Sequence, residues 1–125
     1  MTRARQELDR LEGKPVVETF TIDAAQSWQP TVEVAEGQVV TIRARGMWCG
    51  DTRNPRQTTC GPDGMTKGGE LVYHLEGRVG DGQAFRVGNS ARFTAPASGT
   101  LSFRMSDGNH TNNSGSVTVA IELAQ

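Results

Sequence analysis

The sequence has few of the features that mark membrane, metal-cluster or nucleic-acid-binding proteins. It contains no apolar run close to the roughly 18 residues of a membrane span, which excludes a membrane-spanning helix. The two cysteines, Cys49 and Cys60, are too few for a zinc site, and no suitably spaced histidines accompany them. The 13 Lys and Arg balance 14 Asp and Glu and are scattered, so no nucleic-acid surface is expected. These absences leave a small polar globular domain.

The N-terminus also lacks a secretory signal, because residues 1–15 contain no apolar core and no small-residue cleavage site. We therefore expect either a cytoplasmic protein that is stored and later released or a domain cut from a secreted protein. Ala4, Leu8 and Leu11 recur at helical spacing and predict a short amphipathic helix. We assign residues 1–14 to an N-terminal helical extension and residues 15–125 to one domain.

From Val16 onward the hydrophobic period changes to two, which is typical of half-buried strands. Val40, Ile42 and Ala44 should face one side of a strand that ends near Gly46. Residues 50–70 have several Gly turns and little apolar content, and are expected to form a long irregular loop. Further strand patterns are VVETFTID, TVEV, ELVYHLEGRVG, AFRVG, SARFTA, TLSFRMS and SVTVAIEL. About eight short strands predict an all-β, antiparallel β-sandwich of jelly-roll-like, galactose-binding-like class.

The most informative segment is the polar loop at residues 105–116. It contains one carboxylate, Asp107, and three carboxamides, Asn109, Asn112 and Asn113. Calcium takes six to eight oxygen ligands from carboxylates, carboxamides, backbone carbonyls and water, so this loop is a candidate calcium site. The alternative is a plain polar turn, because Asp, Asn, Gly and Ser are the residues of which turns are made.

Other candidate residues have equally plain alternatives. Pro62-Asp63-Gly64 is a β-turn pattern, although Asp63 could lie at the mouth of a binding site. Trp48, beside the long loop, could stack on a sugar, whereas Trp28 is expected to pack in the core or at an edge. The two cysteines could form a disulfide or stay as thiols. No paired acid and base or nucleophile motif is present, so an enzyme is not expected.

The C-terminal half of the chain resembles the calcium-dependent, galactose-binding bacterial lectins of the LecA (PA-IL) type. The resemblance rests on the order of short motifs: Ala-x-Gly at 44–46 with a following Trp, GRVG at 77–80, VGNS at 87–90, Gly99-Thr100-Leu101, and an Asp followed by Asn-Asn-Ser-Gly-Ser from 107 to 116. The last motif is the specific one. The resemblance covers roughly residues 16–123 and implies a β-sandwich lectin that binds sugar through calcium.

The resemblance also implies the site residues. Calcium would be bound by the side chains of Asp107, Asn112 and Asn113 and by two backbone carbonyls. One carbonyl would be that of Asn109, and the other that of Gly50 or Asp51.

Two hydroxyls of the sugar would complete the calcium shell. The candidate carbohydrate-binding residues are Trp48, Asp63, Asp107, His110 and Asn112. The sequence departs from the family in three places. The loop before the Asn pair is two residues shorter, Gly61-Pro62-Asp63-Gly64 replaces a His-Pro-x-Gln turn, and Gly50 stands where the family has the loop tyrosine that supplies a carbonyl.

The resulting prediction is a non-enzymatic, calcium-dependent lectin with a galactose-type ligand, in which Ca²⁺ is the only cofactor. We expect a homo-oligomer, because linked weak sites gain from multivalency, and no nucleic-acid or membrane partner. The alternative function is a calcium-stabilised accessory or protein-interaction β-sandwich module without a sugar ligand.

Overall fold

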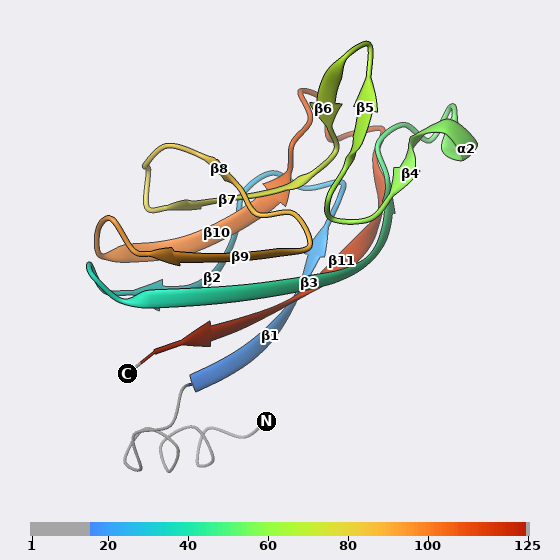
Figure 1. Cartoon of the computed structure of the whole chain (residues 1–125). Coiled ribbons are helices and arrows are strands. Elements are labelled where there is room, and N and C mark those ends of the chain that lie inside the picture. Colours follow the sequence, from blue (N-terminus) through green and yellow to red (C-terminus); the bar gives the residue numbers. More distant parts are fainter. Residues whose placement is uncertain (1–15, 125) are drawn as a thin grey trace.

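The computed structural model describes residues 16–124, and the expected N-terminal helix lies outside this range. Figure 1 shows two packed antiparallel layers with a small hairpin at one end. In chain order the elements are β1 (Val16–Asp23), β2 (Gln29–Val34), β3 (Val39–Cys49), α2 (Pro55–Thr58), β4 (Thr59–Cys60), β5 (Met65–Lys67), β6 (Glu70–Val72), β7 (Leu75–Val79), β8 (Phe85–Arg86), β9 (Ser90–Thr94), β10 (Gly99–Met105) and β11 (Ser114–Leu123). The predicted antiparallel β-sandwich is confirmed. No helix of the described residues is long and apolar enough to cross a bilayer.

The first sheet has the order β1-β11-β3-β4, and β9 also pairs with β3. The second sheet has the order β2-β10-β7-β8, and β5 and β6 form a separate hairpin. Every strand pair is antiparallel. The strands β10 and β11 are consecutive but belong to different sheets, so the chain between them crosses from one layer to the other at the end of the sandwich.

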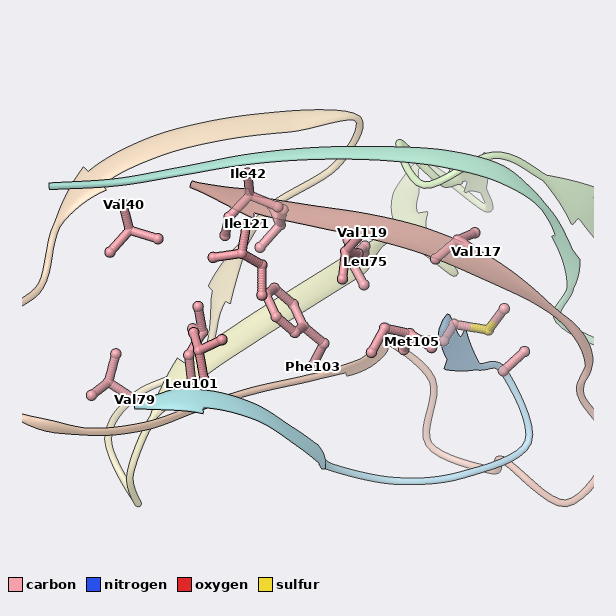
Figure 2. Close-up of a cluster of buried hydrophobic side chains, with 14 of the residues drawn as sticks. Val40, Ile42, Leu75, Val79, Leu101, Phe103, Met105, Val117, Val119 and Ile121 are labelled. Carbon is pink, nitrogen blue, oxygen red and sulfur yellow. The ribbon is translucent and has the colours of Figure 1, made fainter. Parts of the chain in front are cut away.

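The core lies between the two sheets and follows the period-two pattern of the sequence. In β11, Val117, Val119 and Ile121 are buried, and in β3 the buried pair is Val40 and Ile42. Figure 2 shows these side chains meeting those of the opposite sheet, with Phe103 at the centre of the cluster. The opposite sheet contributes Leu75, Val79, Leu101, Phe103 and Met105. Burial of such side chains, each worth about 1.5–3 kcal/mol, is the main source of the sandwich's stability.

Two glycines allow β3 and β11 to bend together beside the candidate site. Gly46 has φ +119° and Gly115 has φ +83°, both in the region that favours glycine. A Cβ at Gly46 would lie 3.1 Å from the Ser116 carbonyl, and one at Gly115 would lie 3.1 Å from that of Met47. The strand β3 therefore continues beyond Gly46 to Cys49, further than the sequence predicts.

The structure corrects the sequence analysis in two other places. Residues 50–70 are not one irregular loop, because they include α2, β4 and β5. The single strand expected over ELVYHLEGRVG is two strands, β6 and β7, with a break at Tyr73. Tyr73 has φ +61°, a backbone conformation that ends a strand and that a bulky residue rarely adopts.

Cys49 and Cys60 are buried free thiols. They lie on adjacent strands, but Cys49 pairs with Thr59 and Cys60 pairs with Trp48. Successive side chains of a strand point to opposite faces, so the two thiols lie on opposite faces of the β3–β4 ribbon. This arrangement decides the question that the sequence left open, because a disulfide needs Cβ atoms that face each other.

Candidate functional site

Three chain segments meet at one end of the sandwich, where β10 passes into β11. The Thr52 amide donates to the Asn112 carbonyl at 2.8 Å, which joins the β3–α2 loop to the β10–β11 loop. The Tyr73 amide donates to the Ser106 carbonyl at 2.9 Å, which joins the β6–β7 junction to the same loop. Figure 1 shows the β10–β11 connection rising beside β6. Segments that are distant in sequence thus form one local cluster.

The consecutive carboxamides Asn112 and Asn113 are the central feature of this cluster. The Oδ1 atoms of both are buried and have no hydrogen-bond partner among the described residues. The Asn113 Nδ2 donates to the Ala24 carbonyl at 2.9 Å and lies 3.3 Å from the Met105 Sδ. Because a carbonyl only accepts, this bond fixes which end of the amide is the oxygen. A buried unpaired oxygen costs about 1–3 kcal/mol, so two adjacent ones indicate a ligand that needs oxygen donors.

Asp107, Asn109 and His110 shape the same loop by local hydrogen bonds. The Asp107 Oδ1 accepts the Asn109 amide at 3.2 Å, and the Asn109 Oδ1 accepts the Thr111 amide at 3.0 Å. Both are Asx turns, in which a side-chain oxygen accepts the amide two residues further along the chain. The His110 Nε2 donates to the Met105 carbonyl at 2.8 Å. The histidine ring is therefore tied to the end of β10, and only its Nδ1 is open to a ligand.

The structure distinguishes between the two carbonyls proposed after β3. The Asp51 carbonyl accepts the Thr58 hydroxyl at 3.0 Å, whereas the Gly50 carbonyl accepts no hydrogen bond from residues 16–124. Gly50 is buried against the Tyr73 ring, and a Cβ there would lie 2.3 Å from the Tyr73 Cδ1. Only glycine fits, because the Tyr73 ring occupies the space that a Cβ would need.

The donor set suits calcium better than a transition metal. The described residues contain no group of three or more His, Cys, Asp or Glu that could hold a metal. The oxygens available are the Asp107 carboxylate, the two unpaired carboxamides and the carbonyls of Gly50 and Asn109. Such hard, mostly neutral oxygen donors are the ligands that calcium accepts. The residues therefore fit the ion that the resemblance implies.

Asp63 is placed elsewhere, in a bond network of its own. Its Oδ1 accepts the Asn89 amide at 2.7 Å and lies 3.5 Å from the Arg86 Nη2. A Cβ at Gly88 would lie 2.4 Å from the same oxygen, so the carboxylate is packed closely on that turn. Asp63 therefore links the β4–β5 turn to the β8–β9 turn through these hydrogen bonds.

Trp48 is a core residue and has no open face for a sugar. Its side chain is 1% exposed, and its Nε1 donates to the Tyr73 carbonyl at 2.9 Å. This bond holds Tyr73 in its unusual conformation, next to Gly50. Trp28 is half-buried, and its ring lies between the guanidinium groups of Arg78 at 4.5 Å and Arg104 at 4.3 Å. Trp28 thus packs on the outside of the second sheet, as expected for an edge residue.

Arg53, Thr58 and Tyr73 contribute to the loops around the candidate site, and no sequence pattern indicates them. Arg53 forms a two-point ion pair with buried Asp51, and Thr58 binds the backbone on both sides of that loop. An Asp-x-Arg spacing in a loop is too common to be noticed as a signal. Tyr73 lay in a pattern that indicated a strand, so its contact with Gly50 had no signal in sequence.

Comparison with known proteins finds a lectin among the solved structures. No family model matches the chain, and no curated protein matches it. The N-terminal domain of EclA, described as a PllA-like lectin, superposes with a TM-score of 0.70 at 28% sequence identity. The match covers 84% of this chain and 94% of that domain. The chain shares its fold with a PllA-like lectin domain over most of its length.

Proposed function

We propose that this protein is a calcium-dependent, carbohydrate-binding lectin domain. The observation that carries the proposal is the pair of buried, unpaired carboxamide oxygens of Asn112 and Asn113. A bound calcium ion would satisfy both oxygens, together with the Asp107 carboxylate and the carbonyls of Gly50 and Asn109. The similarity to a PllA-like lectin domain supports a sugar rather than another ligand.

Sugar binding would use the metal directly. One carboxylate leaves the calcium site with a net positive charge, and two neighbouring sugar hydroxyls would replace water in its shell. We propose a galactose-type ligand, with Asp107 and Asn112 contacting both ion and sugar and His110 at the edge. Binding at such a shallow site is weak, because the hydroxyls give up hydrogen bonds to water. A homo-oligomer would raise the strength of attachment through multivalency.

The test is calorimetric titration of the EDTA-treated protein with calcium, followed by titration of both forms with galactose. We expect heat from calcium, and heat from galactose only in the calcium-loaded form. Asp107→Ala should reduce calcium and galactose binding together by at least 10-fold, because it removes the only carboxylate of the donor set and with it a charge-assisted contact. Unchanged calcium affinity in this variant would show that the ion is not bound in this loop.

A second function, a calcium-stabilised module without a sugar ligand, is favoured by the positions of Asp63 and Trp48. Both were candidate sugar contacts, but the structure holds Asp63 in a turn and Trp48 in the core. Asp63→Ala tests whether Asp63 has a structural role that is independent of the calcium site. We expect it to lower thermal stability while leaving the calcium affinity unchanged. Calcium binding without a response to galactose or a wider glycan set would support the module.

A further inference from the structure

Arg53 is a surface residue whose guanidinium is fixed in position. Its Nε donates to the Asp51 Oδ1 at 2.9 Å, and its Nη2 donates to the Asp51 Oδ2 at 3.0 Å. The Asp51 residue is 6% exposed, whereas the Arg53 side chain is 76% exposed.

The loop that carries this ion pair is itself tied down. The Thr58 hydroxyl accepts the Asp51 amide at 3.1 Å and lies 3.0 Å from the Asp51 carbonyl and 2.9 Å from the Asn54 carbonyl. On the other side, the Thr52 amide donates to the Asn112 carbonyl at 2.8 Å. Arg53 therefore directly follows the residue whose amide binds the backbone carbonyl of Asn112. Arg53 thus lies on the same β3–α2 loop as Gly50, whose carbonyl is a proposed calcium ligand.

This arrangement leaves hydrogen-bond donors of Arg53 for a ligand. The Nε and one N–H of Nη2 are used by Asp51, and Nη1 donates to no acceptor within residues 16–124. A guanidinium presents planar donors that match the oxygens of a carboxylate or sulfate. Because Asp51 has already restricted the side chain, a ligand would lose less affinity to ordering it.

We propose that Arg53 determines the class of ligand, and that the site selects acidic sugars, whose anionic group binds the Arg53 guanidinium while their hydroxyls bind calcium. A neutral galactose would use only the calcium and leave the guanidinium in water. The inference rests on the proposed lectin function. The anionic group can be the carboxylate of a uronic acid or a sulfate ester, since both offer charged oxygens in the geometry that Arg53 recognises.

The experiment compares the affinity of the calcium-loaded protein for four methyl glycosides: galactose, galacturonic acid, the methyl ester of galacturonic acid, and galactose 6-sulfate. We expect the acids to bind about 3-fold to 10-fold more tightly than galactose and the neutral ester. Arg53→Gln should remove most of this preference, measured as the ratio of the affinity for each acid to the affinity for galactose. The preference should also decrease with added salt, since the guanidinium is exposed. Comparing the affinities for galacturonic acid and galactose 6-sulfate shows whether a carboxylate or a sulfate ester fits Arg53 better.

Two further variants control for charge and position. Arg56→Gln removes an equal charge from exposed α2 on the same loop and should leave the preference intact. Asp51→Asn keeps Arg53 but removes the fixed ion pair, so it should lower the ratio of the affinity for the acids to the affinity for galactose. The same preference in wild type and Arg53→Gln, with galactose still bound through calcium, would overturn this inference alone. If no sugar binds, or binding survives EDTA, the proposed lectin function itself fails.

Discussion

Asn112 and Asn113 have the same side chain but separate roles. Asn113 is anchored by its Nδ2, which donates to the Ala24 carbonyl in the β1–β2 loop, so its loss would disturb the protein with or without a ligand. Asn112 forms no side-chain bond of this kind within residues 16–124, and only its carbonyl accepts the Thr52 amide. Its buried Oδ1 therefore costs stability unless a ligand uses it. The two residues can be tested differently.

We predict that Asn112→Leu stabilises the calcium-free protein and removes the stabilisation that calcium gives. In EDTA it should raise the free energy of unfolding by about 1 kcal/mol, because an apolar group of similar size replaces an unpaired buried oxygen. Added calcium should not raise the stability of this variant any further. Urea unfolding in both conditions measures this, and Asn89→Leu, an exposed carboxamide near Asp63, is the matched control. A loss of stability in EDTA with the calcium effect retained would contradict the ligand role.

At the scale of elements, the site depends on the β3–α2 loop and the β6–β7 junction fitting each other. The Tyr73 ring occupies the space beside Gly50, and the Trp48 Nε1 holds the Tyr73 carbonyl at 2.9 Å. The end of β3 and the β6–β7 junction thus fix each other around Gly50, whose carbonyl is a proposed calcium ligand. A change at the contact should affect both the fold and calcium affinity.

Gly50→Ala should destabilise the protein by about 1–3 kcal/mol, because its Cβ would overlap the Tyr73 ring at 2.3 Å. It should also weaken calcium binding, since Tyr73 or the Gly50 carbonyl must move. Thermal unfolding and calorimetry measure the two effects. Gly108→Ala, where a Cβ would meet nothing within 4 Å, is the control and should retain wild-type stability. Equal stability of both variants would show that the contact between Gly50 and Tyr73 is loose.

The sequence predicts elements well where one face of a strand is buried. The apolar residues Val117, Val119 and Ile121 alternate with more polar ones, and all three are buried in the core. A strand with one buried face produces this alternation in its sequence. The sequence does not predict β4 and β5, which are two and three residues long and too short to carry a pattern. In the site, the Asp and Asn residues of one loop are predictable from local composition. The contacts of Tyr73 and Arg53 are not, because they depend on how distant segments meet.

At the scale of the whole molecule, the proposed calcium site lies where the chain crosses between the two sheets. The loop from β10 to β11 joins the layers, and Asn113 binds Ala24, which follows β1 of the first sheet. The ion would thus connect the crossing loop to the β3–α2 loop, which continues from the first sheet. A ligand that binds only the folded state stabilises that state by mass action.

We therefore predict that calcium stabilises the complete sandwich and not only its loops. At 100 times the dissociation constant the gain is about 2.7 kcal/mol, which corresponds to a rise in Tm on the order of 10 °C for a chain of this size. Scanning calorimetry should show one transition that moves upward with calcium and stays in place for Asp107→Ala. If calcium protected residues 50–72 from proteolysis but left the main transition unmoved, the ion would order a loop without linking the two sheets.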